Sequence, residues 1–357
     1  MGHSLPVSDG TPEARERAAQ HLRRQAELTA SALYAAILVA AADDAGAGGP
    51  CWQVLQGHER DPFSTALALK FLGGVHRLVL EGKAPELAPF YPSVGGDANK
   101  GDPFPAFVTT VQQHIGELQK SLDLGVQTNE VGRSAALLPG FLAVANRWRL
   151  PLRIRELGTS AGLNLRWDHF RYERNGRGWG DPDSLVRFGD EVFETDAPFD
   201  IGATVVDRRG CDRAPLDATT DEGRMRLMSY VWPDQPERFH LLENAIEIAR
   251  RVPAAVDEAD AIEWASAQLE HAEPGTATVM FHSIFIQYLK PADRVALEGL
   301  IVAAGRRATE DAPLAYLHME PGEALARVLL TQWPGGTHQV VSEAGYHGRP
   351  VRVTQRA

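Results

Sequence analysis

The sequence contains little of several features that define other classes of protein. Only two of its 357 residues are cysteine, Cys51 and Cys211, too few for a disulfide framework or a cysteine-rich zinc site. Lysine and arginine total 36 against 47 acidic residues, which gives a net charge of −11. This balance excludes the basic surface of a general nucleic-acid binder. The sequence also has no Gly-Lys-Ser/Thr phosphate loop, so nothing indicates hydrolysis of nucleoside triphosphates.

Long apolar runs and a targeting signal are also missing. The longest apolar run, residues 30–42, has 13 residues and still contains Ser31, whereas a helix needs roughly 20 to cross a bilayer. Residues 1–11 lack the basic start and apolar core of a secretory signal. We therefore expect a cytoplasmic protein without a membrane partner. Its apolar content of 44%, in a chain of this length, is sufficient for a sizeable core.

The chain divides into two parts by its hydrophobic patterning. Up to residue 150, apolar side chains recur at intervals of three and four, as over 12–42, 106–124 and 130–149, which predicts helices. From residue 151 on, short β-rich runs alternate with helical stretches, which is typical of a parallel sheet with crossover helices. We predict a helical domain over 1–150 and an α/β domain over 151–357. The expected strands are 152–157, 203–208, 254–256, 277–282, 314–319, 338–342 and 351–354, and the expected helices include 222–232, 236–251, 262–271, 291–304 and 323–330.

A strand that runs into a loop of small residues is the most informative local pattern. The predicted strand ends at Leu157, and Gly158-Thr159-Ser160-Ala161-Gly162 then leads to a short helix start at Leu163. Glycines adopt positive φ and let a ligand approach the backbone, and the free N–H groups at a helix start attract anions. The pattern is explained either by a ligand-binding loop or by a tight turn into a helix.

Acidic residues follow the later predicted strands. Asp212 follows the second strand, where a carboxylate can accept hydrogen bonds from both hydroxyls of a ribose. Asp260 follows the third strand, where a carboxylate can accept from an adenine amino group. Taken singly, each acid is also explained as a solvated loop charge or a helix cap. Ligands of open parallel sheets bind at the carboxyl ends of the strands, so the ordered set favours a binding cleft there.

From Leu152 to Thr354 the chain resembles the class I S-adenosylmethionine-dependent methyltransferases, whose first motif is Glu-x-Gly-x-Gly-x-Gly. Glu156, Gly158 and Gly162 match this motif, and Ser160 stands at the middle glycine. The resemblance implies a Rossmann-like, doubly wound, mostly parallel sheet of the methyltransferase type, preceded by the helical domain. It also implies S-adenosylmethionine as the cofactor and methyl transfer to a small molecule.

The same resemblance assigns roles to individual residues. Asp212 would contact the ribose, Asp260 the adenine, and the segment 282–288 would face the reactive methyl group. The long spacings between these motifs imply insertions near 168–200 and 221–251, the first of which has the pattern of a hairpin. The implied cofactor-binding residues are Glu156, Gly158, Ser160, Gly162, Asn164, Asp212 and Asp260.

Three side chains are candidates for the catalytic step. Methyl transfer depends largely on positioning, and a base is needed only if the nucleophile must lose a proton. His282 can act as that base, and Tyr288 or Glu130 can orient the acceptor. His282 is also explained as a hydrogen-bonded histidine at a strand end, and Glu130 as the partner of Arg133 on one helix face. We expect a small-molecule substrate and no metal.

Over nearly its full length the chain is similar to a bacterial family, domain of unknown function 2332. The similarity rests on the segments 128–133, 156–165 and 232–235. It implies the same two-part architecture and brings no established activity.

Two other functions use the same residues. A module that binds a ligand without turnover would retain the cleft, and Ser160 and the long insertions are consistent with it. Gly158 to Gly162 is also a Gly-x-Ser-x-Gly nucleophile elbow, which predicts a serine hydrolase. Its partners would be an acid, Asp293 or Glu320, and then a histidine, His338 or His347. The helical pattern before Leu152 is against the hydrolase, because that fold places several strands before the elbow.

Overall fold

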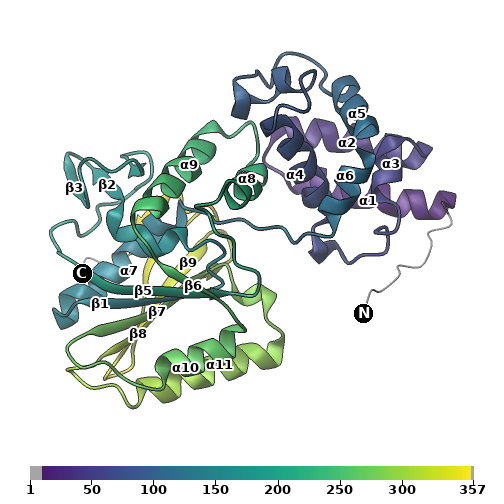
Figure 1. Cartoon of the computed structure of the whole chain (residues 1–357). Coiled ribbons are helices and arrows are strands. Elements are labelled where there is room, and N and C mark those ends of the chain that lie inside the picture. Colours follow the sequence, from purple (N-terminus) through teal and green to yellow (C-terminus); the bar gives the residue numbers. More distant parts are fainter. Residues whose placement is uncertain (1–9, 355–357) are drawn as a thin grey trace. The chain divides into compact units, whose positions relative to one another are not determined.

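The computed structural model describes residues 10–354 and divides them into two compact units. The helical unit contains the chain up to Thr128 together with Asp221–His240, and the sheet unit contains Asn129–Thr220 and the chain from Leu241 on. Figure 1 shows the helices before Thr128 in purple and blue, the later helix α8 of the same unit in green, and the strands of the second unit in teal to yellow. The helical unit is therefore built from two stretches of sequence that are separated by about 90 residues of the sheet unit.

Short helices with defined caps make up the helical unit. The expected helix over 12–42 is wrong as a single element, because the first helix ends at Leu28 and Ser31 caps a second. Its side chain accepts a hydrogen bond from the Tyr34 amide at 3.0 Å, as N-caps do. The expected helix over 106–124 is likewise two helices, separated at His114. The helices are α1 (Pro12–Leu28), α2 (Ala32–Ala47), α3 (Pro50–Leu55), α4 (Leu67–Leu80), α5 (Phe104–Gln113), α6 (Ile115–Leu122), α8 (Asp221–Ser229) and the start of α9 (Pro236–Arg251), with short 3-10 turns at Phe63–Thr65, Ala88–Phe90 and Pro92–Val94.

Helix α4 lies at the centre of the helical core. Phe71, Leu72 and Val75 are buried, and Gly73 lies against the ring of Tyr230, where a Cβ atom would come within 2.6 Å of Cε1. The stretch 63–80, which includes α4, is long and apolar enough to cross a membrane by composition, and half of it is buried. The core helix of a soluble protein passes the same test.

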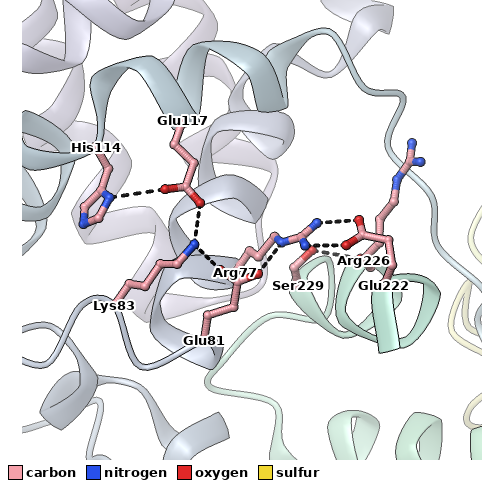
Figure 2. A network of polar contacts seen from close by, with 8 residues as sticks. All are labelled: Arg77, Glu81, Lys83, His114, Glu117, Glu222, Arg226 and Ser229. Atoms are coloured by element: carbon pink, nitrogen blue, oxygen red, sulfur yellow. Dashed lines mark hydrogen bonds and ion pairs between the residues drawn. The ribbon is translucent and has the colours of Figure 1, made fainter. Parts of the chain in front are cut away.

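A charged network joins α4 to α8 within the helical unit. Figure 2 shows the Arg77 guanidinium between two carboxylates, with Glu81 on its own helix and Glu222 on α8. Two parallel bonds of 2.7 and 2.6 Å join Arg77 to Glu222. Lys83 extends the network from Glu81 to Glu117. The second stretch of the unit is thus attached to the first by a bidentate ion pair.

The sheet unit contains a mostly parallel sheet of eight strands, in the order β11-β10-β9-β8-β7-β1-β5-β6. The first five strands in chain order pair in parallel, and β9, β10 and β11 form an antiparallel meander at one end. This confirms the expected mixed α/β architecture with helices ahead of the sheet. The strands are β1 (Leu152–Leu157), β5 (Val205–Asp212), β6 (Ala255–Glu258), β7 (Ala277–Ser283), β8 (Leu314–Pro321), β9 (Ala326–Trp333), β10 (Thr337–Ala344) and β11 (Val351–Val353).

The central strand β1 lies where the direction of strand addition reverses. β5 and β6 follow on one side of β1, and β7 and β8 lie on the other. All of β1 except Arg153 is buried, because helices cover both faces of the sheet. Figure 1 shows α10 (Ala261–Leu269) and α11 (Pro291–Gly305) on one face and α7 (Arg133–Trp148) on the other. The carboxyl ends of β1 and β7 therefore form a topological switch point.

Helix α7 belongs to the sheet unit although it precedes β1. Gly140 allows close packing on β8, since a Cβ atom there would lie 2.2 Å from Leu317 Cδ1. Ser342 of β10 donates to the Ala136 carbonyl at 2.7 Å. Contacts of this kind attach the helix to the strands, and the division between the units accordingly lies at Thr128.

Two segments of the sheet unit test the local predictions. The hairpin pattern after residue 168 is confirmed, since β2 (Arg171–Arg174) and β3 (Arg177–Trp179) pair in antiparallel fashion, and β4 (Arg187–Phe188) completes a small separate sheet. The helix expected over 323–330 is wrong, because this segment forms most of β9. Burial there alternates along the strand, which is the period of a strand and not of a helix.

Candidate functional site

The loop after β1 has the backbone geometry that its small residues predict. Gly158, Ser160 and Gly162 have φ of 65, 55 and 70°, a left-handed conformation that glycine adopts freely and serine only at a cost. The loop then enters a 3-10 helix, η4 (Leu163–His169), instead of an α-helix. Backbone N–H groups of the loop are bonded within the protein, since Thr159 donates to the Cys211 carbonyl at 3.0 Å and Gly162 to the Thr159 carbonyl at 2.8 Å.

Asp212 connects the end of β5 to this loop. Its carboxylate accepts the Ser160 amide at 2.9 Å and the Ala214 amide at 3.0 Å. Asp212 is half-buried, and a carboxylate has about four lone-pair positions. It can therefore hold the loop and still accept further hydrogen bonds.

Asp260 lies one strand farther out and has structural partners of its own. Its side chain caps α10 by accepting the Ile262 amide at 2.9 Å, and its second oxygen lies 3.0 Å from Arg213. The hydrogen bond from Arg213 lowers the pKa of the Asp260 carboxyl. Asp260 is therefore the cap of α10, which is one of the explanations that the sequence offers for this acid.

Glu156 and Asn164 support the loop from the interior. Both side chains are buried. Burial raises the pKa of the Glu156 carboxyl to about 8, against the hydrogen bond from Thr159, which lowers it. Asn164 accepts from the Ser134 hydroxyl at 2.7 Å. These two predicted cofactor-binding residues therefore bond to the protein beneath the loop.

Residues 129–133 bridge the loops that follow β1 and β7. Asn129 accepts the Leu163 amide at 2.9 Å through its side chain, and Arg133 donates to the Ser283 carbonyl at 3.1 Å. Glu130 lies between them and pairs with His347, at 2.8 Å between Oε2 and Nδ1. The Glu130 side chain is 8% exposed and that of His347 is 45% exposed. The structure thus places Glu130 at the switch point with a histidine that the sequence did not suggest as its partner.

His282 belongs to a buried cluster at the ends of β7 and β8. Its side chain is fully buried, with Nδ1 2.9 Å from Glu320 Oε1 and Nε2 2.7 Å from the Tyr316 hydroxyl. His318 stacks on His282 at 5.3 Å between ring centroids, and burial lowers the pKa of His318 to about 3. His282 and His318 are partners in the register of β7 and β8, and this pairing of strands brings the cluster together. Tyr288, by contrast, is 71% exposed.

Glu320 fixes the turn that follows β7. Its Oε1 atom accepts the amides of Phe285 and Ile286 at 2.8 and 3.1 Å. Burial raises the pKa of Glu320, but its hydrogen bonds from His282 and these amides outweigh that effect and the pKa is lowered. The turn places the Phe285 ring on the glycine loop, where a Cβ atom on Gly158 would lie 2.3 Å from Phe285 Cδ2. The two motifs after β1 and β7 therefore meet in direct contact.

Three of the residues expected as partners in a serine hydrolase are engaged in separate pairs. Glu320 bonds to His282, His338 to Thr331 at 2.8 Å, and His347 to Glu130. Asp293 lies in the first turn of α11. Across residues 10–354 no group of three or more histidine, cysteine or acidic side chains could hold a metal ion.

A comparison with protein families identifies the relatives of this chain. The family described as "Uncharacterized protein conserved in bacteria (DUF2332)" matches residues 19–353. The chain belongs to this family. Comparison with curated proteins gave no match, and comparison with solved structures gave none either.

The segments that carry the DUF2332 resemblance lie in two places. Residues 129–133 and 156–165 meet at the switch point through Asn129 and Asn164. The third segment, 232–235, lies in the helical unit, where Asp234 accepts the Leu33 amide at 3.3 Å. Two of the three segments in this DUF2332 member therefore form one site at the carboxyl edge of the sheet.

Proposed function

We propose that the sheet unit is Rossmann-like, of the methyltransferase type, that it binds S-adenosylmethionine, and that the protein transfers a methyl group to a small molecule. The observation that carries the proposal is the strand order β6-β5-β1-β7-β8, with the glycine loop after the central strand and Asp212 at the end of the next. Ligands of such sheets bind at the switch point.

The residues at this edge fit the nucleoside part of the cofactor. Asp212 has acceptor positions beyond its bonds to Ser160 and Ala214, so it can accept from ribose hydroxyls. The N–H groups of Ser160 and Gly162 are bonded to Asp212 and to the Thr159 carbonyl, so the loop would meet the cofactor through its left-handed backbone, which small residues leave open to close approach. The Phe285 ring covers Gly158, which explains why a residue without a side chain stands there. We therefore assign cofactor contact to the later part of the loop.

Several side chains would position the reacting groups. When bound, the cofactor supplies an electrophilic methyl group on its sulfonium. Arg133 and Glu320 hold the turn after β7 beside the glycine loop. Glu130 orients the His347 ring, and this half-exposed imidazole can remove a proton from an acceptor. His282 is fully buried and acts through Glu320, so its role is to position the turn.

A second candidate is a protein that binds the same kind of ligand without turnover. Ser160 in place of a glycine and the Phe285 ring over Gly158 favour it. Binding alone would be shared by both functions, so turnover must be measured separately, as S-adenosylhomocysteine released in the presence of acceptor mixtures.

Calorimetric titration with S-adenosylmethionine and S-adenosylhomocysteine tests the cleft. We expect micromolar binding that Asp212→Asn weakens by about 1–3 kcal/mol, since ribose hydroxyls would lose a charged acceptor. Asp257→Asn is the matched control, because this acid lies in the neighbouring strand β6 but bonds to Arg209 and Trp264. No binding at millimolar ligand, or equal affinity in the folded Asp212 variant, would contradict the proposal.

A further inference from the structure

A separate cavity of about 480 Å³ lies in the sheet unit behind the glycine loop. It is bordered by the loop after β5, the end of α9 and the start of β6. The volume falls within the roughly 300–1,000 Å³ of small-molecule sites. Most of its walls are apolar, among them Ala161, Leu216, Ala218, Ala249 and Val256.

Arg166 lines this cavity from η4 and is 4% exposed. Its Nε atom donates to the Val252 carbonyl at 2.9 Å and Nη1 to the Gly162 carbonyl at 2.6 Å. Nη2 has no acceptor among residues 10–354, and no carboxylate in that range lies within 4.0 Å of the guanidinium. Burial, and then the charge of Arg208, lower the pKa of Arg166 to about 10, against the charges of Glu156 and Asp217, which raise it. The cation is therefore partly desolvated, and the acids near it do not reach ion-pair distance.

The buried Arg155 and the half-buried Arg208 in the same unit are paired. Arg155 is 2% exposed and bonds to Asp207. Arg208 forms a bidentate pair with Asp168, at 2.7 and 3.0 Å. A buried charge is costly unless it is paired. The contrast indicates that the missing partner of Arg166 comes from outside the chain.

The charges at the rim of the cavity are already engaged. Asp217 is exposed and accepts the amide and hydroxyl of Thr219. Arg250 is exposed and pairs with Glu247. The Asp217 carboxylate would repel a second negative group at this rim. A ligand with one anionic end and an apolar remainder therefore fits the cavity.

We propose that this cavity binds a small molecule with a single carboxylate or phosphate head group on Arg166 and an apolar body against the alanine, leucine and valine walls. Ala161 of the glycine loop also lines this cavity, but the head-group contact on Arg166 does not depend on the function proposed above, because it uses neither Asp212 nor the turn after β7.

Calorimetric titration of the full chain with hexanoate, hexyl phosphate and 1-hexanol tests the proposal. We expect saturable binding of at least one anion, and hexanol weaker by roughly tenfold or more, because it lacks the charge that pairs with Arg166. The tighter anion identifies the head group. Absence of binding of both anions at millimolar concentrations, or hexanol binding equal to the tighter anion, would overturn the proposal.

Two variants locate the binding. Arg166→Met should weaken the tighter anion by roughly tenfold or more. Ala254→Phe places a ring in the cavity from a half-buried wall position, whereas Ala255→Phe, at the exposed next residue, is the matched control.

We expect the Ala254 variant to lose anion binding, the Ala255 variant to keep it, and both to bind S-adenosylmethionine as the wild type does. If Arg166→Met does not fold, the Ala254→Phe and Ala255→Phe variants and the comparison with hexanol test the proposal. Wild-type anion affinity in the folded Ala254 variant would overturn the assignment.

Discussion

Glu156 is a carboxyl group whose protonation at neutral pH depends on its place in the fold. Burial at the end of β1 raises the pKa of its carboxyl to about 8, so it is mostly protonated at neutral pH. Below the pKa of the unfolded chain, about 4.5, folded and unfolded forms both bind this proton. Between about pH 4.5 and 8 only the folded protein holds it, so its contribution to stability is lost as pH rises through this window.

We therefore predict that Glu156→Gln reduces the loss of stability between pH 5 and 8. The difference from the wild type should be on the order of a few kcal/mol. Urea denaturation at a series of pH values measures it. Glu258→Gln, at an exposed position on β6, is the control and should keep the wild-type pH dependence. A wild-type slope in the Glu156 variant would contradict the assigned protonation.

Gly158 carries two constraints that a matched pair of variants separates. Gly158 and Gly176 both have positive φ, 65 and 74°, but only Gly158 has a neighbour in the way of a Cβ atom. Gly176→Ala should destabilise by about 1–2 kcal/mol, from backbone strain alone. Gly158→Ala should cost about 1–3 kcal/mol more, because the Phe285 ring must move. Equal losses in chemical denaturation would mean that Phe285 moves freely.

The sequence predicts the positions of the loop residues but not their neighbours. Gly158, Ser160 and Gly162 follow a strand, and that local pattern is enough to place a turn. Phe285 lies more than 120 positions away, and Glu320 farther still, so their contact with the loop depends on the order of strands in the sheet. A single sequence contains no local signal for that order.

At the scale of elements, α8 depends on a side-chain contact that can be tested. Asp221 and Glu222 both lie in its first turn, where an acid favours the helix dipole, but Glu222 also bonds to Arg77, as Figure 2 shows. We predict that Glu222→Gln destabilises more than Asp221→Asn by about 0.2–1 kcal/mol, since the pair is partly exposed. Denaturation at low and high salt measures this, and the difference should shrink with salt.

The sequence predicts some helices and strands more accurately than others. The α9 prediction, 236–251, has the bounds of the structure, because proline starts the helix and its apolar spacing is regular. Segment 323–330 contains alanine and leucine, good helix formers, which favour a helix. Pairing with β8 and β10 overrides this preference and makes it β9.

At the scale of the whole molecule, the change of pattern near residue 150 indicates two kinds of structure. It does not reveal that residues 221–240 belong with the helices, because a helical pattern has no mark of its tertiary partner. The partner is decided by contacts such as His76 Nδ1 with the Ser229 carbonyl at 3.1 Å and Gly73 with Tyr230.

We predict that residues 1–128 alone do not form the native helical unit. Without Asp221–His240 the surface of α4 that carries His76 and Gly73 loses its cover, and buried apolar side chains become exposed. Joining 1–128 to 221–240 through a flexible linker should restore a cooperative thermal transition in circular dichroism. A fragment 1–128 that melts cooperatively at the midpoint of the linked form would contradict this.

The divided helical unit also has a consequence during synthesis. The ribosome must add about 110 residues after Thr128 before His240 completes the unit, which takes roughly 5 to 20 s at typical elongation rates. During this interval the first helices emerge with an uncovered apolar face. From the emergence of α4 until that of α8, the nascent chain therefore exposes apolar surface that the complete unit buries.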